Sequence, residues 1–386
     1  MAKTVAILGA GGSVGTQAQD VARTRGYRVD FLSGNKNVAA TEAAVREFCP
    51  TWVAMADEES ALDLRSRIKD TSTKVLAGEA GICEGIAHSN ADTVVNSILG
   101  KAGLMPTLAT LDSGKRLALA NKESLVIAGD IVMRKSAEAN AEIIPVDSEH
   151  SAIFQSLKSG RPCEVKRLLL TASGGPFFGK SREELRSVTL SDTLAHPTWK
   201  MGRKITVDSA TLMNKGFEII EAVHLFGIPA DKIEVVIHRE SILHSAVEYI
   251  DNSVVGELSS PDMRACVQYA IDYPARMSAC IQPLDLFSLG SLTFARPDYE
   301  AFPALSLAKR AVNMGGGCGA VLNAADEVAV EAFLEDKIGF ADIYEAVSYT
   351  FEKLTMAENA VTLDQILLYD EEARARASEY IAKHTK

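Results

Sequence analysis

The fold of this chain is decided by the stretch TVAILGAGGSVG at residues 4–15. The apolar run at its start predicts a buried strand over residues 4–8, and the small residues after it predict a tight turn into a helix that reaches Ala22. Such a turn lets the backbone approach a pyrophosphate group at a helix N-terminus. We interpret residues 9–15 as a dinucleotide-binding loop. A tight turn in any parallel αβ protein is the alternative.

The same alternation of apolar runs and amphipathic stretches continues to about residue 146. Further strands are predicted at residues 28–32, 52–55, 74–77, 116–120 and 142–146. Strands that alternate with helical patterns indicate βαβ units and a mostly parallel sheet. The fold class is therefore α/β, with an N-terminal Rossmann-like, dinucleotide-binding domain over residues 1–146. A second glycine cluster at residues 315–319 has no strand before it, so we predict only a helix entry there.

The end of the second strand indicates which cofactor the loop binds. An NAD-dependent enzyme places an acidic residue there to accept from the ribose 2′-hydroxyl. This chain instead has Ser33-Gly34-Asn35-Lys36-Asn37, and Asp30 comes too early, inside the strand. A hydroxyl, an amide and a cation suit a 2′-phosphate, so the prediction is NADP(H). The cofactor-binding candidates from these two segments are Gly11, Gly12, Ser13, Val14, Gly34, Asn35, Lys36 and Asn37.

The pattern changes after residue 146. Strands are predicted at residues 165–171, 204–207, 235–238, 245–249 and 254–258 with fewer helices between them, which indicates a central α+β domain over residues 147–272 with a mainly antiparallel sheet. A long polar loop, about residues 173–203, is predicted to be a flexible lid. Residues 273–302 form a proline-punctuated linker, and residues 303–386 form a C-terminal α-helical domain. Within that domain, residues 340–354 and 370–386 are expected to be helices.

The run PVDSEH at residues 145–150 offers ligands for a divalent cation. Asp147 and Glu149 point to the same side of an extended segment, and carboxylate oxygens suit Mg²⁺ or Mn²⁺, with Co²⁺ as a further candidate. Glu218, on a helix that Asp208 or Ser209 can cap, is the third candidate ligand. A solvated acidic turn is the alternative for the first two residues.

A second polar cluster suits a phosphate group. Asn214 and Glu218 share a helix face with Lys215 beside them, and an amide and an ammonium near a helix N-terminus form a good anion site. Ser173 and His196, at the two ends of the polar loop, are further candidates, although His196 could be a locally bonded loop residue. Lys122 follows a strand end, where ligands of open parallel sheets gather, although a surface cation is the alternative. Trp199 is a lid contact or a core residue.

Composition excludes some functions. The net charge of −11 provides no basic field for nucleic acid. No apolar run reaches the ~18 residues of a membrane span, and no signal-peptide pattern is seen. The six cysteines are scattered, which indicates reduced, mostly buried thiols in a cytoplasmic protein.

Several of these motifs together resemble the 1-deoxy-D-xylulose 5-phosphate reductoisomerase family over essentially the whole chain. The segments that carry the resemblance are the glycine loop, LANKESLV (119–126), PVDSEHSAIFQSL (145–157), TASGGPF (171–177), HPTWKMGRKITVDSATLMNKGFEIIEA (196–222), SPDMR (260–264) and AVLNAADEVAVEAFL (320–334). The order and spacing of DSEH and DSAT-MNKG-E are highly specific. The resemblance implies an NADP-dependent oxidoreductase that isomerises and reduces a phosphorylated sugar, using NADPH and a divalent metal, in non-mevalonate isoprenoid precursor biosynthesis.

The resemblance also implies roles for single residues. The metal ligands would be Asp147, Glu149 and Glu218, which with Lys122 form the catalytic set. The substrate contacts would be Lys122, Ser148, Glu149, Ser173, His196, Trp199, Ser209, Asn214, Lys215 and Glu218. Further cofactor contacts would be Asn121, Glu123, Gly202 and Met263. The family association implies a homodimer, with the sheet of the middle domain as the expected interface.

Three departures from the family pattern stand out. Gly11 occupies a position where the family usually has Thr or Ser, Arg239-Glu240 replaces Pro-Gln in the turn after His238, and the residues after Arg264 are atypical. None falls on a proposed metal or phosphate ligand.

Two rival functions are considered. Another two-domain NADP-dependent dehydrogenase would need no metal, and a non-catalytic NADP-binding sensor would bind cofactor without turnover.

Overall fold

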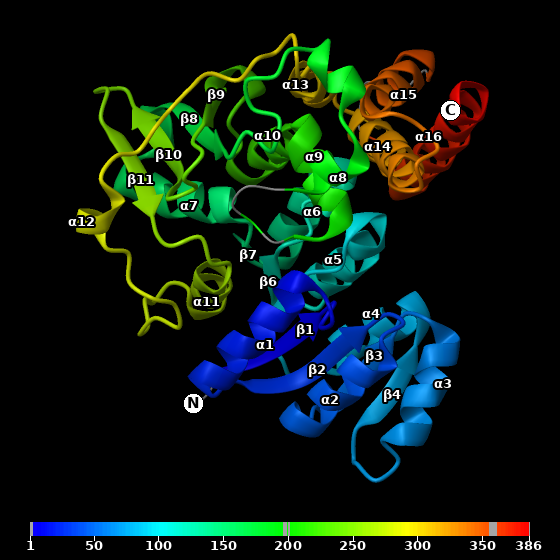
Figure 1. Cartoon of the computed structure of the whole chain (residues 1–386). Helices are drawn as coiled ribbons and strands as arrows, with labels where there is room; N and C mark the ends of the chain where they lie inside the picture. Colours follow the sequence, from blue (N-terminus) through cyan, green and yellow to red (C-terminus); the bar gives the residue numbers. More distant parts are fainter. Residues whose placement is uncertain (1–2, 196–198, 200, 355–360, 386) are drawn as a thin grey trace. The chain divides into compact units, whose positions relative to one another are not determined.

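The protein forms two compact units that are interleaved along the sequence. The computed structural model describes residues 3–195, 199, 201–354 and 361–385 (Figure 1). The first unit comprises Met1–Ser124, Val132–Ser151 and Asp262–Pro283, and the second comprises Leu125–Ile131, Ala152–Pro261 and Leu284–Lys386. Each unit therefore gathers segments from distant parts of the sequence. The linear domain boundaries given above remain predictions.

The first unit is built on a seven-stranded parallel sheet in the order β4-β3-β2-β1-β5-β6-β7. The strands are β1 Thr4–Leu8, β2 Arg28–Gly34, β3 Trp52–Met55, β4 Lys74–Ala77, β5 Thr93–Asn96, β6 Arg116–Leu119 and β7 Ile143–Pro145. This arrangement confirms the predicted Rossmann-like α/β fold. Strand β5, which pairs with β1, was not predicted, because its four residues contain only two apolar side chains. The order places the ends of β6 and β7 next to each other.

Helices alternate with these strands along the sequence. They are α1 Ser13–Arg25, α2 Val38–Phe48, α3 Glu58–Arg67, α4 Gly78–His88, η1 Gly100–Gly103, α5 Leu104–Asp112 and α6 Glu123–Ala139, with α7 Ser148–Ser156 starting after β7. Helix α11 (Arg264–Asp272) belongs to the same unit although it follows most of the second unit in sequence. The phenol of Tyr27 donates to Asp272 at 2.7 Å, and Arg264 pairs with Asp20 at 2.7 Å. These contacts join α11 to α1 and to the start of β2.

The second unit contains a four-stranded sheet in the order β11-β10-β8-β9. Its strands are β8 Val165–Ala172, β9 Ile233–Ile237, β10 Leu243–Tyr249 and β11 Val254–Leu258. Strand β10 is antiparallel to both β8 and β11, and only β8 and β9 are parallel, so the mainly antiparallel prediction is confirmed. The strand predicted at residues 204–207 was wrong, because these residues lie in helix α9 (Arg203–Thr211). Its Ile-Thr-Val run favours a strand locally, but burial of Val207 and Ala210 on one helix face overrides that propensity.

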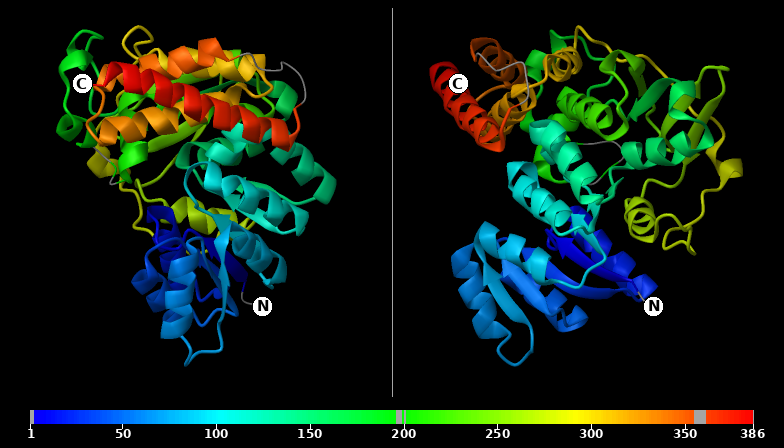
Figure 2. Two further views of the ribbon diagram at one scale, coloured as in Figure 1. Left: turned by 90° about the vertical axis from the view of Figure 1, so that its right-hand side faces the viewer. Right: turned by 180° about the vertical axis from the view of Figure 1, so that it is seen from behind.

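The rest of the second unit is helical. Its elements are η2 Leu157–Ser159, η3 Pro162–Glu164, η4 Glu184–Ser187, α8 Leu190–Leu194, α10 Met213–Phe226, η5 Ala230–Lys232, α12 Leu286–Leu289, α13 Ala304–Met314, α14 Cys318–Leu334, α15 Phe340–Lys353 and α16 Leu363–His384. Helices α14, α15 and α16 lie side by side (Figure 2). The predicted C-terminal helices are confirmed, although α16 starts at Leu363, where Thr362 and Gln365 form a capping box. The glycine cluster at 315–319 leads into α14, as predicted.

The described part of the chain contains no helix that is both long and apolar enough to span a membrane. All six cysteines are free. The prediction that most of them are buried was wrong, since Cys266 and Cys318 are buried but Cys49 and Cys163 are exposed.

Candidate active site in two halves

The glycine loop has the geometry that the sequence predicted. It lies between β1 and α1, and Gly9 adopts a φ of +75° that an L side chain rarely adopts. A Cβ at Gly15 would lie 2.1 Å from the carbonyl oxygen of Gly9, so only glycine fits there. Gly11, Gly12 and Ser13 are exposed. The backbone of this loop is therefore open to a bound pyrophosphate group.

The end of β2 holds the loop and presents polar groups. The buried Ser33 hydroxyl accepts from the backbone N–H of Gly9 at 3.1 Å, so this side chain supports the loop from inside the sheet. Asn35 and Lys36 are exposed, whereas the Asn37 side chain caps α2. Asp30 is fully buried and accepts from the Thr51 hydroxyl at 2.7 Å. Lys36, Asn35 and Asn37 are thus the exposed candidates for a 2′-phosphate, and Asn37 is also the N-cap of α2.

The first half of the candidate active site lies where β6 and β7 end. Because Leu119 pairs with Pro145, the turns after the two strands are neighbours. Lys122 follows one turn and Asp147 the other, and Nζ lies 2.5 Å from Oδ2. Both side chains are largely buried, with 8% and 16% exposed. The parallel sheet therefore assembles this ion pair.

The two carboxylates after β7 are close enough to share one cation. A carboxylate oxygen of Asp147 and one of Glu149 lie within 4.8 Å of each other, and the Ser148 hydroxyl donates to Glu149 at 2.6 Å. The prediction of an extended segment was wrong. Helix α7 begins directly after Asp147, and Glu149 lies in its first turn. The turn into the helix therefore brings one carboxylate oxygen of each acid together. An all-oxygen pair of this kind fits Mg²⁺ or Mn²⁺.

Asn121 and Glu123 organise the turn that carries Lys122. The buried Asn121 amide donates to the Glu123 carboxylate at 2.8 Å and to the Gly100 carbonyl at 3.0 Å. Its oxygen accepts from the backbone N–H of Ser124 at 3.1 Å. These bonds give both side chains a structural role, and their contact with a cofactor remains a prediction.

The second half lies at a break between two helices. Helix α9 ends at Thr211, Leu212 has a φ of +59°, and α10 starts at Met213. The single helix capped by Asp208 or Ser209 was therefore a wrong prediction, because both residues lie inside α9. The break also determines where two of the candidate phosphate contacts lie. It places Asn214 and Lys215 in the first turn of α10, where the positive end of the helix dipole favours an anion.

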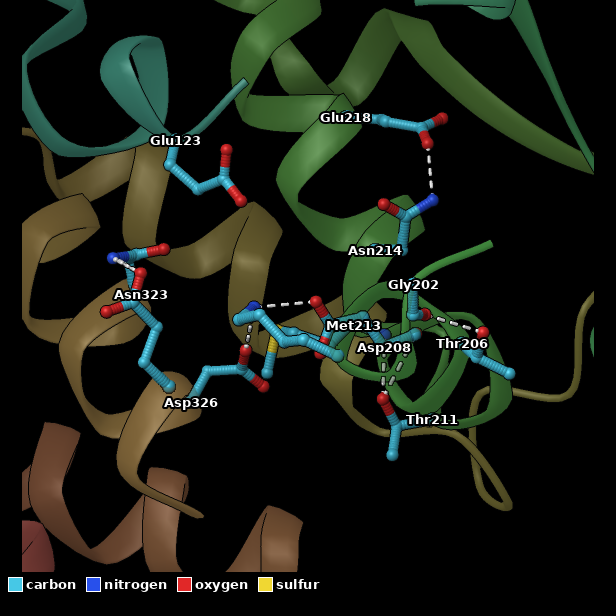
Figure 3. A network of polar contacts seen from close by, with 12 residues as sticks. Glu123, Gly202, Thr206, Asp208, Thr211, Met213, Asn214, Glu218, Asn323 and Asp326 are labelled. Carbon is cyan, nitrogen blue, oxygen red and sulfur yellow. Dashed lines mark hydrogen bonds and ion pairs between the residues drawn. The ribbon is translucent and has the colours of Figure 1, made fainter. Parts of the chain in front are cut away.

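Glu218 is held by the two residues that the sequence placed beside it. The Asn214 amide donates to Glu218 Oε1 at 2.5 Å, and Figure 3 shows these two side chains turned toward one another. Lys215 forms an ion pair with the other oxygen. The side chains of Lys215 and Glu218 are only 3% and 1% exposed. This half is thus a buried, charge-balanced cluster.

The glycine turn after β8 packs against α9. Gly174 and Gly175 have φ angles of +78° and +64°, and a Cβ at Gly175 would lie 2.8 Å from the Ser209 carbonyl oxygen. This close approach brings the Ser173 turn to the Ser209 turn of α9. Two of the predicted phosphate contacts are therefore neighbours in the fold.

The predicted lid contains two short helices, η4 and α8, rather than loop alone. His196 lies outside the described residues. Trp199 is half-buried, and its ring centroid lies 6.4 Å from that of His244. Gly202 is exposed and precedes α9, whereas Met263 precedes α11 in the first unit.

A cluster of three charged residues that the sequence analysis did not identify joins α9 to α14. Lys204 contacts both Asp208, one turn along the helix, and Asp326 of α14. The spacing of Lys204 and Asp208, four residues apart, was the only signal in the sequence. Asp326 also lines a pocket of about 310 Å³ beside α15, which contains none of the predicted metal or phosphate ligands.

These features define a class of protein. A parallel sheet with an open glycine loop is typical of Rossmann-like dinucleotide-binding proteins. Buried carboxylate–lysine pairs outside that loop are typical of an enzyme site. The comparisons with known proteins agree with this class and specify the family.

The sequence matches the family described as 1-deoxy-D-xylulose 5-phosphate reductoisomerase at residues 5–129, its C-terminal domain at 143–226, and the DXP reductoisomerase C-terminal domain at 258–376. A 1-deoxy-D-xylulose 5-phosphate reductoisomerase from Caldanaerobacter subterraneus is 50% identical, covering 97% of this chain and 98% of the relative. One from Acetivibrio thermocellus is 49% identical, covering 99% and 100%. The chain belongs to the 1-deoxy-D-xylulose 5-phosphate reductoisomerase family, as the resemblance predicted.

Solved structures agree. The enzyme from Zymomonas mobilis in complex with NADPH superimposes with a TM-score of 0.92 at 40% identity, covering 99% of both chains. A DOX-P reductoisomerase in complex with NADPH, fosmidomycin and magnesium gives a TM-score of 0.91 at 39% identity, covering 98% of both.

Proposed function

We propose that this protein converts 1-deoxy-D-xylulose 5-phosphate into 2-C-methyl-D-erythritol 4-phosphate, using NADPH and Mg²⁺ or Mn²⁺, in isoprenoid precursor biosynthesis. The observation that carries the proposal is family membership over nearly the whole chain. Structures of relatives with NADPH and magnesium support the choice of cofactors. The open glycine loop and the paired carboxylates of this chain fit both.

The metal ligands in this proposal are Asp147, Glu149 and Glu218. The adjacent oxygens of Asp147 and Glu149 support this assignment, as does the burial of Glu218. A bound divalent cation supplies Lewis-acid polarisation of the substrate ketone and a neighbouring hydroxyl. Lys122, already beside Asp147, places a positive charge near the oxygen on which negative charge develops, and Ser148 orients Glu149.

Asn214 and Lys215 bind the phosphate group of the substrate in this proposal, together with Ser173, Ser209 and His196. The positions of Asn214 and Lys215 in the first turn of α10 support this role. Phosphate binding far from the reacting carbons supplies energy for closing the lid, with Trp199, over the substrate and for excluding water.

NADPH binds along the glycine loop, with its pyrophosphate at Gly11, Gly12, Ser13 and Val14. The exposed side chains at the end of β2 support a 2′-phosphate site at Asn35 and Lys36, with Gly34 and Asn37 beside them. The remaining contacts in this proposal are Asn121, Glu123, Gly202 and Met263.

NADPH absorbance measured with purified protein, 1-deoxy-D-xylulose 5-phosphate and Mg²⁺, with and without EDTA, tests the proposal. We expect oxidation that requires both the substrate and the metal. Oxidation that persists in EDTA would favour a metal-independent NADP dehydrogenase. Bound NADPH without turnover under all conditions would favour the sensor.

The protein also forms a homodimer in this proposal, through the outer strand of the four-stranded sheet. Val254, at the start of this outer strand β11, is 55% exposed, and Ile250, in the turn before it, is 64% exposed. Phe287, in the segment after residue 283, is fully exposed. Exposed apolar edge strands pair with other chains. Light scattering of Val254→Lys should show monomer where the unaltered protein shows dimer. If the variant is still a dimer, the interface lies elsewhere on the molecule and the assignment to the outer strand is wrong.

A further inference from the structure

A buried group of charges joins the start of α9 to α14. The Nζ atom of Lys204 lies 2.6 Å from Asp208 Oδ2 and 2.9 Å from Asp326 Oδ2. The Asp208 and Asp326 side chains are 5% and 0% exposed, and the Lys204 side chain is 24% exposed. Figure 3 shows both acids within the network of polar contacts around α9. One ammonium group therefore serves two carboxyl groups.

The charges of this group do not balance if both acids are ionised. Among the described residues, the second oxygen of each acid, Oδ1, is buried and receives no hydrogen bond from an N–H or hydroxyl donor. An unpaired buried carboxylate is strongly disfavoured. One proton on the pair removes the excess charge and lets one carboxyl group donate to the other.

The pKa directions agree with this geometry. Burial, together with the negative charge of Asp326, raises the pKa of Asp208 to about 7. Burial likewise raises the pKa of Asp326. Lys204 opposes the shift in both acids, yet does not abolish it. A pair of like charges that share a site titrates as a unit.

The other charged groups near the pair have partners of their own. On α14, Glu327 follows Asp326 and pairs with Arg374 of α16 at 2.5 Å, and Arg374 also pairs with Asp370. From α10, the ring of Phe217 lies 5.4 Å from Lys204 Nζ.

The pocket that Asp326 lines brings further charged groups to this side of α14. Arg182 pairs with Glu345 of α15 at 3.0 Å, Asp342 caps α15, and Arg186 lines the same pocket. Arg182 is engaged by Glu345, and among the ion pairs of the described residues Lys204 is the cation that contacts Asp208 and Asp326.

The group acts on the helix that carries a predicted substrate contact. Helix α9 begins directly after Gly202, where the predicted lid ends, and Lys204 lies in its first turn. Ser209 lies further along the same helix. A lysine is unfavourable at a helix N-terminus, so the two acids compensate for its position. We propose that Asp208 and Asp326 share one proton and, through Lys204, hold the first turn of α9 in place for substrate binding. Asp326 is then a positioning residue, and this part of the inference rests on the proposed function.

The shared proton predicts a specific dependence of the free energy of unfolding on pH. The folded protein holds this proton at pH values where an unfolded aspartate, with a pKa near 4, has lost it. The contribution of this pair to the free energy of unfolding therefore falls as the pH rises from about 4 to about 7, and the fall ends above the folded pKa. Asp326→Asn leaves one carboxylate, that of Asp208, for Lys204 to balance, so no shared proton is needed and the variant should lack this fall.

Thermal unfolding of the unaltered protein and Asp326→Asn between pH 5 and 8.5 tests the shared proton without any assay of activity. The melting temperature of Asp326→Asn should gain about 4 °C relative to the unaltered protein over this range. Glu352→Gln, which removes an exposed carboxylate on α15, is the control and should follow the unaltered protein. Parallel profiles for Asp326→Asn and the unaltered protein would overturn the shared proton.

Steady-state kinetics test the positioning role. The KM for 1-deoxy-D-xylulose 5-phosphate should rise about threefold between pH 6.5 and 8.5 in the unaltered protein and stay level in Asp326→Asn, with similar kcat values. Asp326→Leu, which cannot hold Lys204, should have a raised KM at every pH. A normal KM in Asp326→Leu would overturn the positioning role, and an inactive but NADPH-binding unaltered protein would refute only the proposed function.

Discussion

The two halves of the candidate active site use the same chemistry on different scaffolds. In the first unit, Lys122 pairs with Asp147 at the ends of two adjacent parallel strands. In the second, Lys215 pairs with Glu218 within one turn after a helix break. The first pair keeps 8% and 16% of its side chains exposed, whereas the second keeps 3% and 1%. The same pair of charges is thus partly hydrated in one half and dry in the other.

The difference shows what each scaffold contributes. A sheet edge brings together side chains from distant parts of the sequence, and the pair stays accessible to solvent and ligands. A helix break concentrates its ligands within a few residues, but the break itself requires strained backbone at Leu212 and a tightly packed surrounding. We therefore expect the second half to be more sensitive to substitution.

The largest effect is expected for Glu218→Gln. The amide keeps the shape of the side chain but removes a proposed metal ligand, so turnover should fall by more than about 100-fold. NADPH binding, followed by its fluorescence, should be unchanged, which also shows that the variant is folded. Glu352→Gln is the matched control. Near-normal turnover of Glu218→Gln would refute the metal assignment.

Replacing each lysine by methionine compares the two halves directly. Lys215→Met leaves Glu218 buried without its cation and should lower the free energy of unfolding by about 3–5 kcal/mol. Lys122→Met should cost less, about 1–3 kcal/mol, because Asp147 retains some contact with water. Urea denaturation measures both values. Equal losses would mean that the difference in burial has no energetic consequence.

Leu212→Gly tests the helix break. Glycine would relieve a left-handed conformation worth roughly 1–2 kcal/mol, but removal of a buried leucine costs roughly 2–5 kcal/mol. The lost packing should outweigh the relieved strain, so we expect the free energy of unfolding, measured by urea denaturation, to fall by about 1–3 kcal/mol. A more stable variant would show that strain, and not packing, dominates at this position.

The smallest effect is expected in the glycine loop. A Cβ at Gly11 would meet nothing within 4 Å, so Gly11→Thr should fold normally and, by adding a hydroxyl, lower the KM for NADPH by about two- to threefold. Gly15→Ala is the contrast, because its Cβ would collide with Gly9 and disrupt cofactor binding. If Gly11→Thr loses cofactor affinity instead, the departure at Gly11 is an adaptation of this chain.

The sequence predicted the first half of the site better than the second. The rule that ligands gather at strand ends led to Lys122 and Asp147, and parallel pairing of β6 and β7 confirms that they meet. Residues 204–207 were wrongly predicted as a strand, because β-branched residues favour strands locally. The break at Leu212 was also missed, since leucine at a positive φ has no signal in the sequence.

The sequence by itself determined the parallel sheet, the glycine loop, the family and the residue types of the site. These follow from apolar periodicity and from motifs whose residues are close along the chain. Only the tertiary structure decided that Asp326 of α14 meets Lys204 and Asp208 of α9, more than a hundred residues earlier. The physical reason is that the charge state of a buried acid depends on which groups surround it in space, and no local pattern encodes that environment.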